Sequence, residues 1–213
     1  YNPFNPAMAA YVFLLVSYPL AMTSWLPPDI PELLEAGGLV TLSFLDSARL
    51  IFTGSLPAGL GWDAVSSATP LDEMFTKLGQ NAMISEIRQS PLWGDFGGRG
   101  WEWVSNWFLL GGLYLLWRKV ITWHIPVSML LGVVIPAGML WMFDPQAFPF
   151  PAFHVFAGAT ILGAFFIATD PVSGCTTRKG QLIYGAAIGL LVVVIRHWGG
   201  YPDAVAFAVL LMN

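Results

Sequence analysis

The sequence has little charge and a single cysteine. Only 10% of its 213 residues are charged, whereas 56% are hydrophobic, and the mean hydropathy is +0.65. These values exclude the surface of an ordinary water-soluble protein, and no nucleic-acid partner is expected. Because Cys175 has no second cysteine to pair with, an internal disulfide and a cysteine metal site are excluded, so redox chemistry would need a bound cofactor.

The motifs of soluble enzymes are also missing. The sequence contains no glycine-rich phosphate loop, no nucleophile elbow and no dinucleotide fingerprint. Its three histidines, His124, His154 and His197, have no second histidine or cysteine at ligand spacing, so no metal site is expected. The chain should therefore have no complete active site of its own.

Long apolar stretches are what the sequence does contain. A membrane-spanning helix needs about 20 residues. Five stretches have this length or nearly so, and they lie at residues 7–25, 103–117, 124–143, 149–168 and 181–198. The stretch at 103–117 is short and should include either Trp101 and Glu102 or the residues after Arg118, and a further stretch begins at Ala204. The pattern predicts an all-α polytopic membrane protein, a helical bundle with broken helices.

Basic residues in the short loops predict the orientation. Arg118 and Lys119 follow the second stretch, and Arg178 and Lys179 follow the fourth, so these loops should be cytoplasmic. Residues 26–101 then lie on the opposite side of the membrane, and their nine acidic against four basic residues agree with that side.

Three parts follow from this topology. Residues 1–25 form a helix break and the first span, residues 26–101 an extracytoplasmic segment, and residues 102–213 the remaining spans, of which the last is cut. The abrupt ends suggest an internal fragment of a larger, repeat-built fold. Arg196 lies at the predicted outer end of its span, although Lys and Arg prefer the cytoplasmic side, and its side chain is expected to snorkel to the membrane surface.

Proline pairs and glycines predict where helices break and pack. Asn2-Pro3 and Asn5-Pro6 precede the first span and Asp170-Pro171 follows the fourth, and each is either a helix break lining a polar site or a loop outside the bilayer. Spans four and five carry small residues that allow close packing inside the bundle, namely Gly158, Ala159, Gly163, Ala164, Gly185, Ala186 and Gly189.

A short polar pattern occurs twice. DAVSSAT at residues 63–69 and DPVSGCT at residues 170–176 share an Asp, a Ser three residues later and a Thr three residues after that. Thr69 and Thr176 therefore occupy equivalent positions. The simplest interpretation is that Ser67 or Thr69 caps an amphipathic helix that starts at Pro70 and extends over 71–87.

Six blocks of sequence resemble one family. They are YNPFNPAM, MTSWLPP, SSATPLD, WHIPVS, GAFFIATDPVS and IRHWGGYPDAVAFAVLLMN, and together they run through essentially the whole chain. They are similar to the D subunits of Rnf electron-transport complexes. The related B subunit of the sodium-translocating NADH:quinone oxidoreductase has the same architecture and is the close alternative.

The resemblance implies a covalent flavin. In these families FMN is esterified through its phosphate to a threonine in the motif Asp-x-x-Ser/Thr-x-Ala-Thr, which a flavin transferase recognises outside the cytoplasm. Asp63, Ser66, Ala68 and Thr69 match every defined position, so Thr69 is the expected attachment site. Thr176 is the alternative, but Cys175 replaces the alanine and its loop is predicted to be cytoplasmic.

The resemblance also implies a function. The expected protein belongs to a redox-driven translocase in the bacterial inner membrane, which passes electrons between ferredoxin and NAD and moves Na⁺ or H⁺, together with the other subunits of the complex. A second, non-covalent flavin is a further expectation. The rival hypotheses are a secondary transporter or channel without a redox cofactor and a passive scaffold for other subunits.

A labelling experiment tests the predicted topology. A cysteine placed near Thr69 should react with a membrane-impermeant thiol reagent in intact cells, because residues 26–101 are predicted to be periplasmic. Labelling seen only after lysis would show that this segment faces the cytoplasm.

Overall fold

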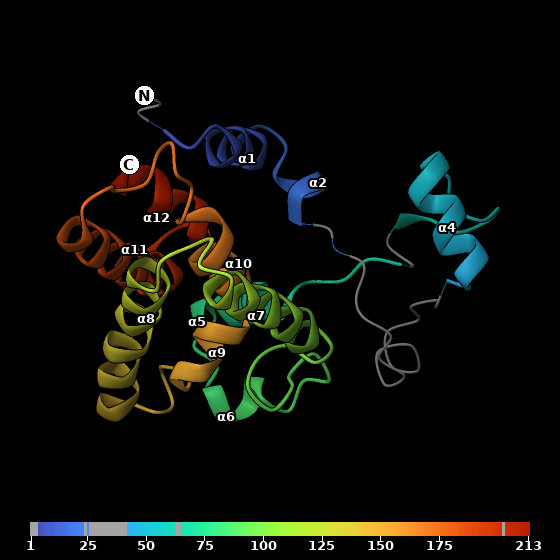
Figure 1. The fold of residues 1–213 in the computed structure, drawn as a ribbon. Coiled ribbons are helices and arrows are strands. Elements are labelled where there is room, and N and C mark those ends of the chain that lie inside the picture. Colours follow the sequence, from blue (N-terminus) through green and yellow to red (C-terminus); the bar gives the residue numbers. More distant parts are fainter. Residues whose placement is uncertain (1–3, 24, 26–41, 63–64, 202) are drawn as a thin grey trace.

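The computed structural model describes residues 4–23, 25, 42–62, 65–201 and 203–213, and Figure 1 shows that these residues form helices joined by loops. The predicted all-α class is confirmed for this part of the chain. In chain order the helices are α1 (Pro6–Ser17), α2 (Pro19–Thr23), α4 (Phe44–Thr53), α5 (Pro70–Gly79), α6 (Ile84–Ile87), α7 (Trp101–Trp117), α8 (His124–Phe143), α9 (Pro151–Phe156), α10 (Thr160–Leu162), the π-helix η2 (Gly163–Ile167), α11 (Arg178–Trp198) and α12 (Val205–Met212).

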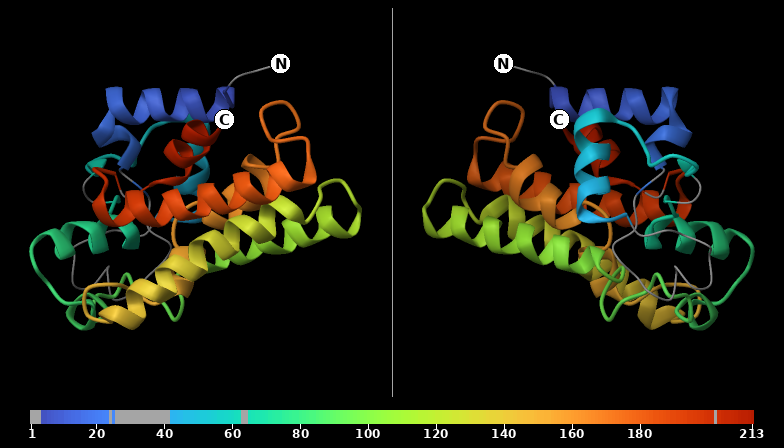
Figure 2. Two further views of the ribbon diagram at one scale, coloured as in Figure 1. Left: turned by 90° about the vertical axis from the view of Figure 1, so that its left-hand side faces the viewer. Right: turned by 90° about the vertical axis from the view of Figure 1, so that its right-hand side faces the viewer.

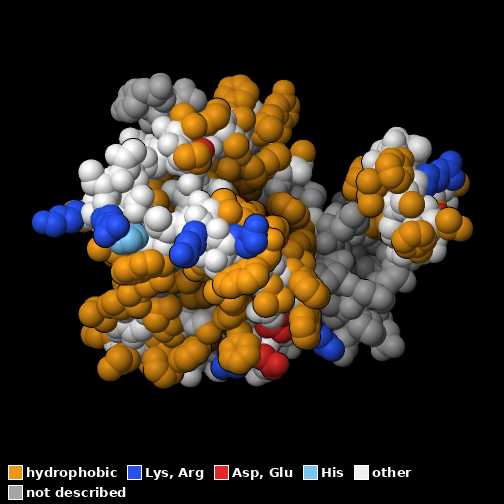
Figure 3. Space-filling view, in the orientation of Figure 1, with side chains coloured by type: hydrophobic (Ala, Val, Ile, Leu, Met, Phe, Trp, Pro, Cys, Tyr) orange, Lys and Arg blue, Asp and Glu red, His pale blue; other side chains and the backbone are white. Residues whose placement is uncertain are grey.

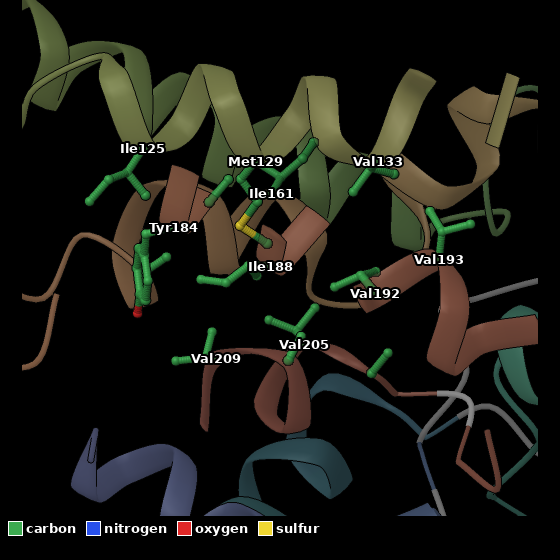
Figure 4. Packing of buried hydrophobic residues seen from close by; sticks show 14 of the residues in the cluster. Ile125, Met129, Val133, Ile161, Tyr184, Ile188, Val192, Val193, Val205 and Val209 are labelled. Carbon is green, nitrogen blue, oxygen red and sulfur yellow. The ribbon is translucent and has the colours of Figure 1, made fainter. Parts of the chain in front are cut away.

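Two long helices, α8 and α11, form the centre of the bundle. They are 20 and 21 residues long, and both are apolar enough to cross a membrane. The Ser128 hydroxyl, near the start of α8, donates to the carbonyl of Gln181, near the start of α11, so the two helices run in the same direction. Their contact buries a continuous apolar core (Figure 4), which includes Ile125, Met129, Val133, Tyr184, Ile188 and Val192.

Shorter helices extend the bundle on both sides of α11. The two views of Figure 2 show α12 between α11 and α1, while α7 packs against α9, α10 and η2. Hydrophobic side chains cover much of the face in Figure 3, and a row of Lys and Arg side chains crosses it. An apolar surface interrupted by a narrow basic band is typical of a protein that spans a membrane.

The first predicted span, residues 7–25, is interrupted, so its prediction as one helix is wrong. Helix α1 ends at Ser17, Tyr18 leaves the helical region (φ −134°, ψ 58°), and α2 begins at Pro19. Pro19 favours an end to the first helix, because proline lacks the N–H and its ring collides with the preceding turn, although α8 continues through Pro136.

Asn5 begins α1, and it does not interrupt a span. Its side-chain oxygen accepts hydrogen bonds from the backbone N–H groups of Ala7 (3.1 Å) and Met8 (3.2 Å), and Pro6 is the first helical residue. This is an N-cap with proline at the first position. The Asn2-Pro3 pair lies outside the described residues.

The fourth predicted span, residues 149–168, is broken in its middle. Helix α9 ends at Phe156, Gly158 takes a left-handed conformation (φ 65°), and α10 starts at Thr160 and continues into η2. The glycine was predicted only to allow close packing. Its positive φ, which a residue with a side chain rarely adopts, is what permits the break.

Arg196 is buried at this break, so the prediction that it snorkels is wrong. Only 1% of the residue is exposed. Its guanidinium donates to the carbonyl oxygens of His154 (2.6 Å) and Ala157 (3.0 Å), which the end of α9 leaves without intrahelical partners. The side chain is therefore directed into the bundle.

The segment before α7 forms short helices on one end of the bundle. Helix α7 begins at Trp101, which is the first of the two extensions predicted for the short stretch at 103–117. The amphipathic helix predicted over 71–87 is wrong in extent, because Asn81 takes a left-handed conformation (φ 65°) and separates α5 from α6.

Glycine at position 132 is required by the contact between α8 and α11. A Cβ on Gly132 would overlap the carbonyl oxygen of Ala186, which is backbone and cannot move aside cheaply. We therefore expect Gly132→Ala to lower the free energy of unfolding by about 1–3 kcal/mol, measured by titration with a denaturing detergent.

Gly138, in the same helix, provides the matched control. A Cβ there would lie 3.6 Å from the ring of Pro151, which is an ordinary contact. Gly138→Ala should therefore not lower the midpoint of the detergent titration. Equal midpoints for the two variants would contradict the described packing.

Candidate functional site

Thr69 caps helix α5. Its backbone is extended (φ −76°, ψ 156°), its hydroxyl oxygen accepts the N–H of Asp72 at 3.2 Å, and Pro70 is the first helical residue. The predicted cap is thus confirmed for Thr69. Thr69 is half-buried and Ala68 before it is exposed, and the Thr69 hydroxyl lies near the positive end of the helix dipole.

The other residues of the first motif lead into this cap. The N–H of Ser66 bonds to the carbonyl of Trp62 (2.9 Å), and the N–H of Ser67 bonds to that of Trp25 (2.9 Å). Ser66 is half-buried. Asp63, the first residue of the motif, lies outside the described residues.

The start of α5 packs on the broken helix. Leu71 and Met74 are buried in one cluster with Phe153 and Ala157, at the end of α9. The ring of Pro70 lies against Gly98, where a Cβ would overlap it. These contacts hold Thr69 beside the break at Gly158.

Thr69 lines a cavity of about 390 Å³. This volume is within the usual range of about 300–1,000 Å³ for small-molecule sites. The walls come from α1, α2, the start of α5, α7, the break and the segment before α12, and they include Tyr11, Leu15, Trp25, Thr69, Leu71, Asp72, Trp101, Ser105, Phe108, Gly158, Leu162, Tyr201, Asp203 and Val205. The lining is mainly apolar and aromatic, with few polar groups.

Three polar or aromatic features of the cavity are well defined. The indole rings of Trp25 and Trp101 meet edge to face, with centroids 5.8 Å apart. The Tyr11 hydroxyl donates to the Asp203 carboxylate at 2.7 Å, although the two residues are far apart in the sequence. Burial raises the pKa of Asp72, whose N–H donates to the Thr69 hydroxyl.

Tyr11 and Asp203 are cavity residues that sequence reasoning missed. Tyr11 lies in an apolar stretch and Asp203 in a short loop, and no motif links them. The only sequence signal was an aspartate next to a span, which indicates a polar site but does not identify the residue that the aspartate binds.

The second copy of the motif forms a different structure. The Asp170 carboxylate accepts both the N–H (3.0 Å) and the hydroxyl (2.7 Å) of Ser173, and the hydroxyl bond lowers the pKa of Asp170. Thr177 caps α11 through the N–H of Gly180 (3.2 Å), while Thr176 is exposed and does not line the cavity. The two threonines of the repeated pattern therefore have different environments.

Two of the three histidines, one from α9 and one near the C-terminal end of α11, meet in the bundle. The Nε2 atoms of His154 and His197 are 3.2 Å apart, a contact that the sequence spacing had not suggested. Within the described residues no third His, Cys, Asp or Glu joins them in a group that could hold a metal ion.

Comparison with known proteins gives one consistent result. The model of the NQR2, RnfD, RnfE family matches residues 1–213. A protein of Yersinia pestis, named as the D component of an ion-translocating oxidoreductase complex, is 54% identical over 220 residues, which cover all of this chain and 61% of the relative. Proteins of the same name from Alcanivorax borkumensis and Salmonella newport are 53% and 50% identical over all of this chain, and it covers 58% and 61% of them.

The capping role of Thr69 can be measured before any modification. In protein made without a flavin transferase, Thr69→Ala should cost about 1 kcal/mol of unfolding free energy, because the Asp72 N–H loses its acceptor. Thr69→Ser keeps the acceptor and should retain most of the stability. A Thr69→Ala protein as stable as the parent would show that this hydrogen bond is dispensable.

Proposed function

The chain belongs to the NQR2, RnfD, RnfE family, and we propose that it is part of a membrane subunit of an ion-translocating electron-transport complex that carries FMN covalently on Thr69. The chain spans about 60% of the length of the curated relatives it matches. The observation that carries the proposal is the position of Thr69, which matches the attachment motif, is half-buried and lines a mainly apolar cavity.

The start of α5 suits the phosphate of FMN. In the attachment, the Thr69 oxygen would form the ester bond to the flavin phosphorus and lose its proton, while the phosphoanhydride bond of a flavin dinucleotide donor breaks and a nucleoside monophosphate leaves. The product carries a negative charge at the N-terminus of a ten-residue helix, where the helix dipole favours anions.

The cavity suits the flavin ring. Isoalloxazine is flat and largely apolar, and Trp25, Trp101 and Phe108 offer aromatic surface to it. When bound, FMN supplies the electron-transfer chemistry that side chains lack. The protein residues bind the ring, exclude water and keep the group at high effective concentration beside its redox partners.

The remaining motif residues act in recognition. Ser66 and Ala68, together with Asp63, form the sequence that the flavin transferase would bind, and the half-buried and exposed positions of Ser66 and Ala68 are compatible with access. The loop is then periplasmic and the protein lies in the bacterial inner membrane. The other subunits of the complex are its partners, and the complex passes electrons between ferredoxin and NAD while moving Na⁺ or H⁺.

Two alternatives make different use of the same features. A secondary transporter or channel would use Thr69 only as the helix cap that it is, with the Asn-Pro and Asp-Pro segments forming a substrate site. However, Asn5 caps α1, and neither it nor Asp170 lines the Thr69 cavity. A subunit of an NADH:quinone oxidoreductase would have the same covalent FMN and a second, non-covalent flavin, but different partners.

In-gel fluorescence tests the proposal. The full-length protein, co-expressed with its flavin transferase, should give a fluorescent band on a denaturing gel, because an ester-linked flavin survives denaturation. Thr69→Ala should be dark and Thr176→Ala should remain fluorescent. A dark parent band would exclude a covalent flavin, and fluorescence that survives Thr69→Ala would exclude this attachment site.

A further inference from the structure

Arg196 is a buried cation held by the break in the fourth span. Its Nη1 donates to the His154 carbonyl (2.6 Å), and its Nη2 donates to the Ala157 carbonyl (3.0 Å) and the Thr160 hydroxyl (3.0 Å). Thr160 in turn donates to the His154 carbonyl at 2.7 Å. The guanidinium and one hydroxyl thus satisfy the polar groups that the break exposes.

The hydrogen bonds of Arg196 do not neutralise its charge. Its bonded partners are all uncharged, and the described part of the chain places no carboxylate within ion-pair distance of it. Its Nε also has no acceptor there. The charge of Asp203 attracts it, but only from beyond that distance. A buried charge without a close counter-ion is costly, and a charged residue within a membrane bundle usually has a function. Capping alone could be done by a neutral amide.

The charge lies directly behind the wall of the Thr69 cavity. Gly158 and Ala157 line that cavity, and Ala157 accepts from the guanidinium through its carbonyl. A Cβ added to Gly158 would lie only 2.9 Å from Nη2 of Arg196. The backbone of the break, with no side chain at Gly158, therefore separates the cation from the cavity.

We propose that Arg196 is the counter-charge for negative charge that the redox group in the Thr69 cavity gains on reduction, so that it raises the reduction potential of that group. This inference rests on the proposed function, in which the cavity holds a flavin. A flavin ring that accepts two electrons and one proton from its donor gains one negative charge. A fixed cation stabilises that charge strongly across a low-dielectric wall, with little reorganisation of the protein.

Asp203 provides an opposite charge on the same cavity. Its Oδ2 accepts the Tyr11 hydroxyl at 2.7 Å, and its buried Oδ1 has no partner among the described residues. A carboxylate here disfavours added negative charge in the cavity. Removing Asp203 should therefore shift the reduction potential in the direction opposite to that caused by removing Arg196.

The midpoint potential of the attached flavin tests the inference. In the full-length chain purified with its flavin, Arg196→Gln should disfavour the reduced form at least tenfold relative to the oxidised form, which lowers the midpoint by about 30 mV for a two-electron couple. Arg196→Lys keeps the charge and should shift the ratio less than threefold. Asp203→Asn should raise the midpoint, and Tyr11→Phe is its control because it removes the hydrogen bond without a charge.

The outcomes separate this inference from the proposed function. A flavin attached to Arg196→Gln with the parent midpoint would overturn the counter-charge, and equal shifts for Gln and Lys would assign Arg196 a purely structural role. If Arg196→Gln does not fold, the midpoint potential of Asp203→Asn is the test. A midpoint equal to or lower than that of the parent protein overturns the inference. A parent protein without any covalent flavin would instead overturn the proposed function.

Discussion

The hydrogen bonds between Arg196 and the broken fourth span are the interaction on which the rest of the structure depends. Inside a bilayer, backbone carbonyls that a helix end leaves free must find partners within the protein. Gly158 permits the break, and the guanidinium of Arg196, from α11, binds the freed carbonyls of His154 and Ala157. The result ties the short helices α9 and α10 to the central helix α11, so an irregular segment can persist inside the bundle.

The segment before α7 packs against the same break. Leu71 and Met74 of α5 share a buried cluster with Phe153 and Ala157, which holds the start of α5 beside Gly158. Thr69 therefore caps its helix at the edge of a cavity whose wall is the break itself. In the proposed function, a flavin tethered there would have an aromatic wall on one side and a buried cation behind another. The break at Gly158 would thus stabilise the fold, position the attachment site and affect the reduction potential of the cofactor.

Sequence patterns predicted much of this fold, and their failures have physical causes. The apolar stretches at 124–143 and 181–198 became α8 and the greater part of α11, because length and composition suffice to define an uninterrupted helix. The stretches at 7–25 and 149–168 are equally apolar, but the backbone leaves the helical conformation at Tyr18 in one and at Gly158 in the other. A proline alone does not predict such a break, because α8 continues through Pro136, and hydropathy does not register it either. Thr69 was recognisable as a cap from Pro70. The Tyr11–Asp203 pair and the direction of the Arg196 side chain depend on tertiary contacts, which a local pattern does not contain.

The central claim is that Thr69 carries the cofactor of this protein. Its most direct test is mass spectrometry of trypsin-digested full-length protein, purified from cells that contain the flavin transferase. Cleavage after Arg49 and Lys77 releases the peptide that contains Thr69, and cleavage after Lys119 and Arg178 releases the one that contains Thr176. The account predicts that the first peptide gains the mass of FMN less one water, with fragment ions that locate the addition at Thr69. An unmodified first peptide, or the same addition on the second, would contradict it.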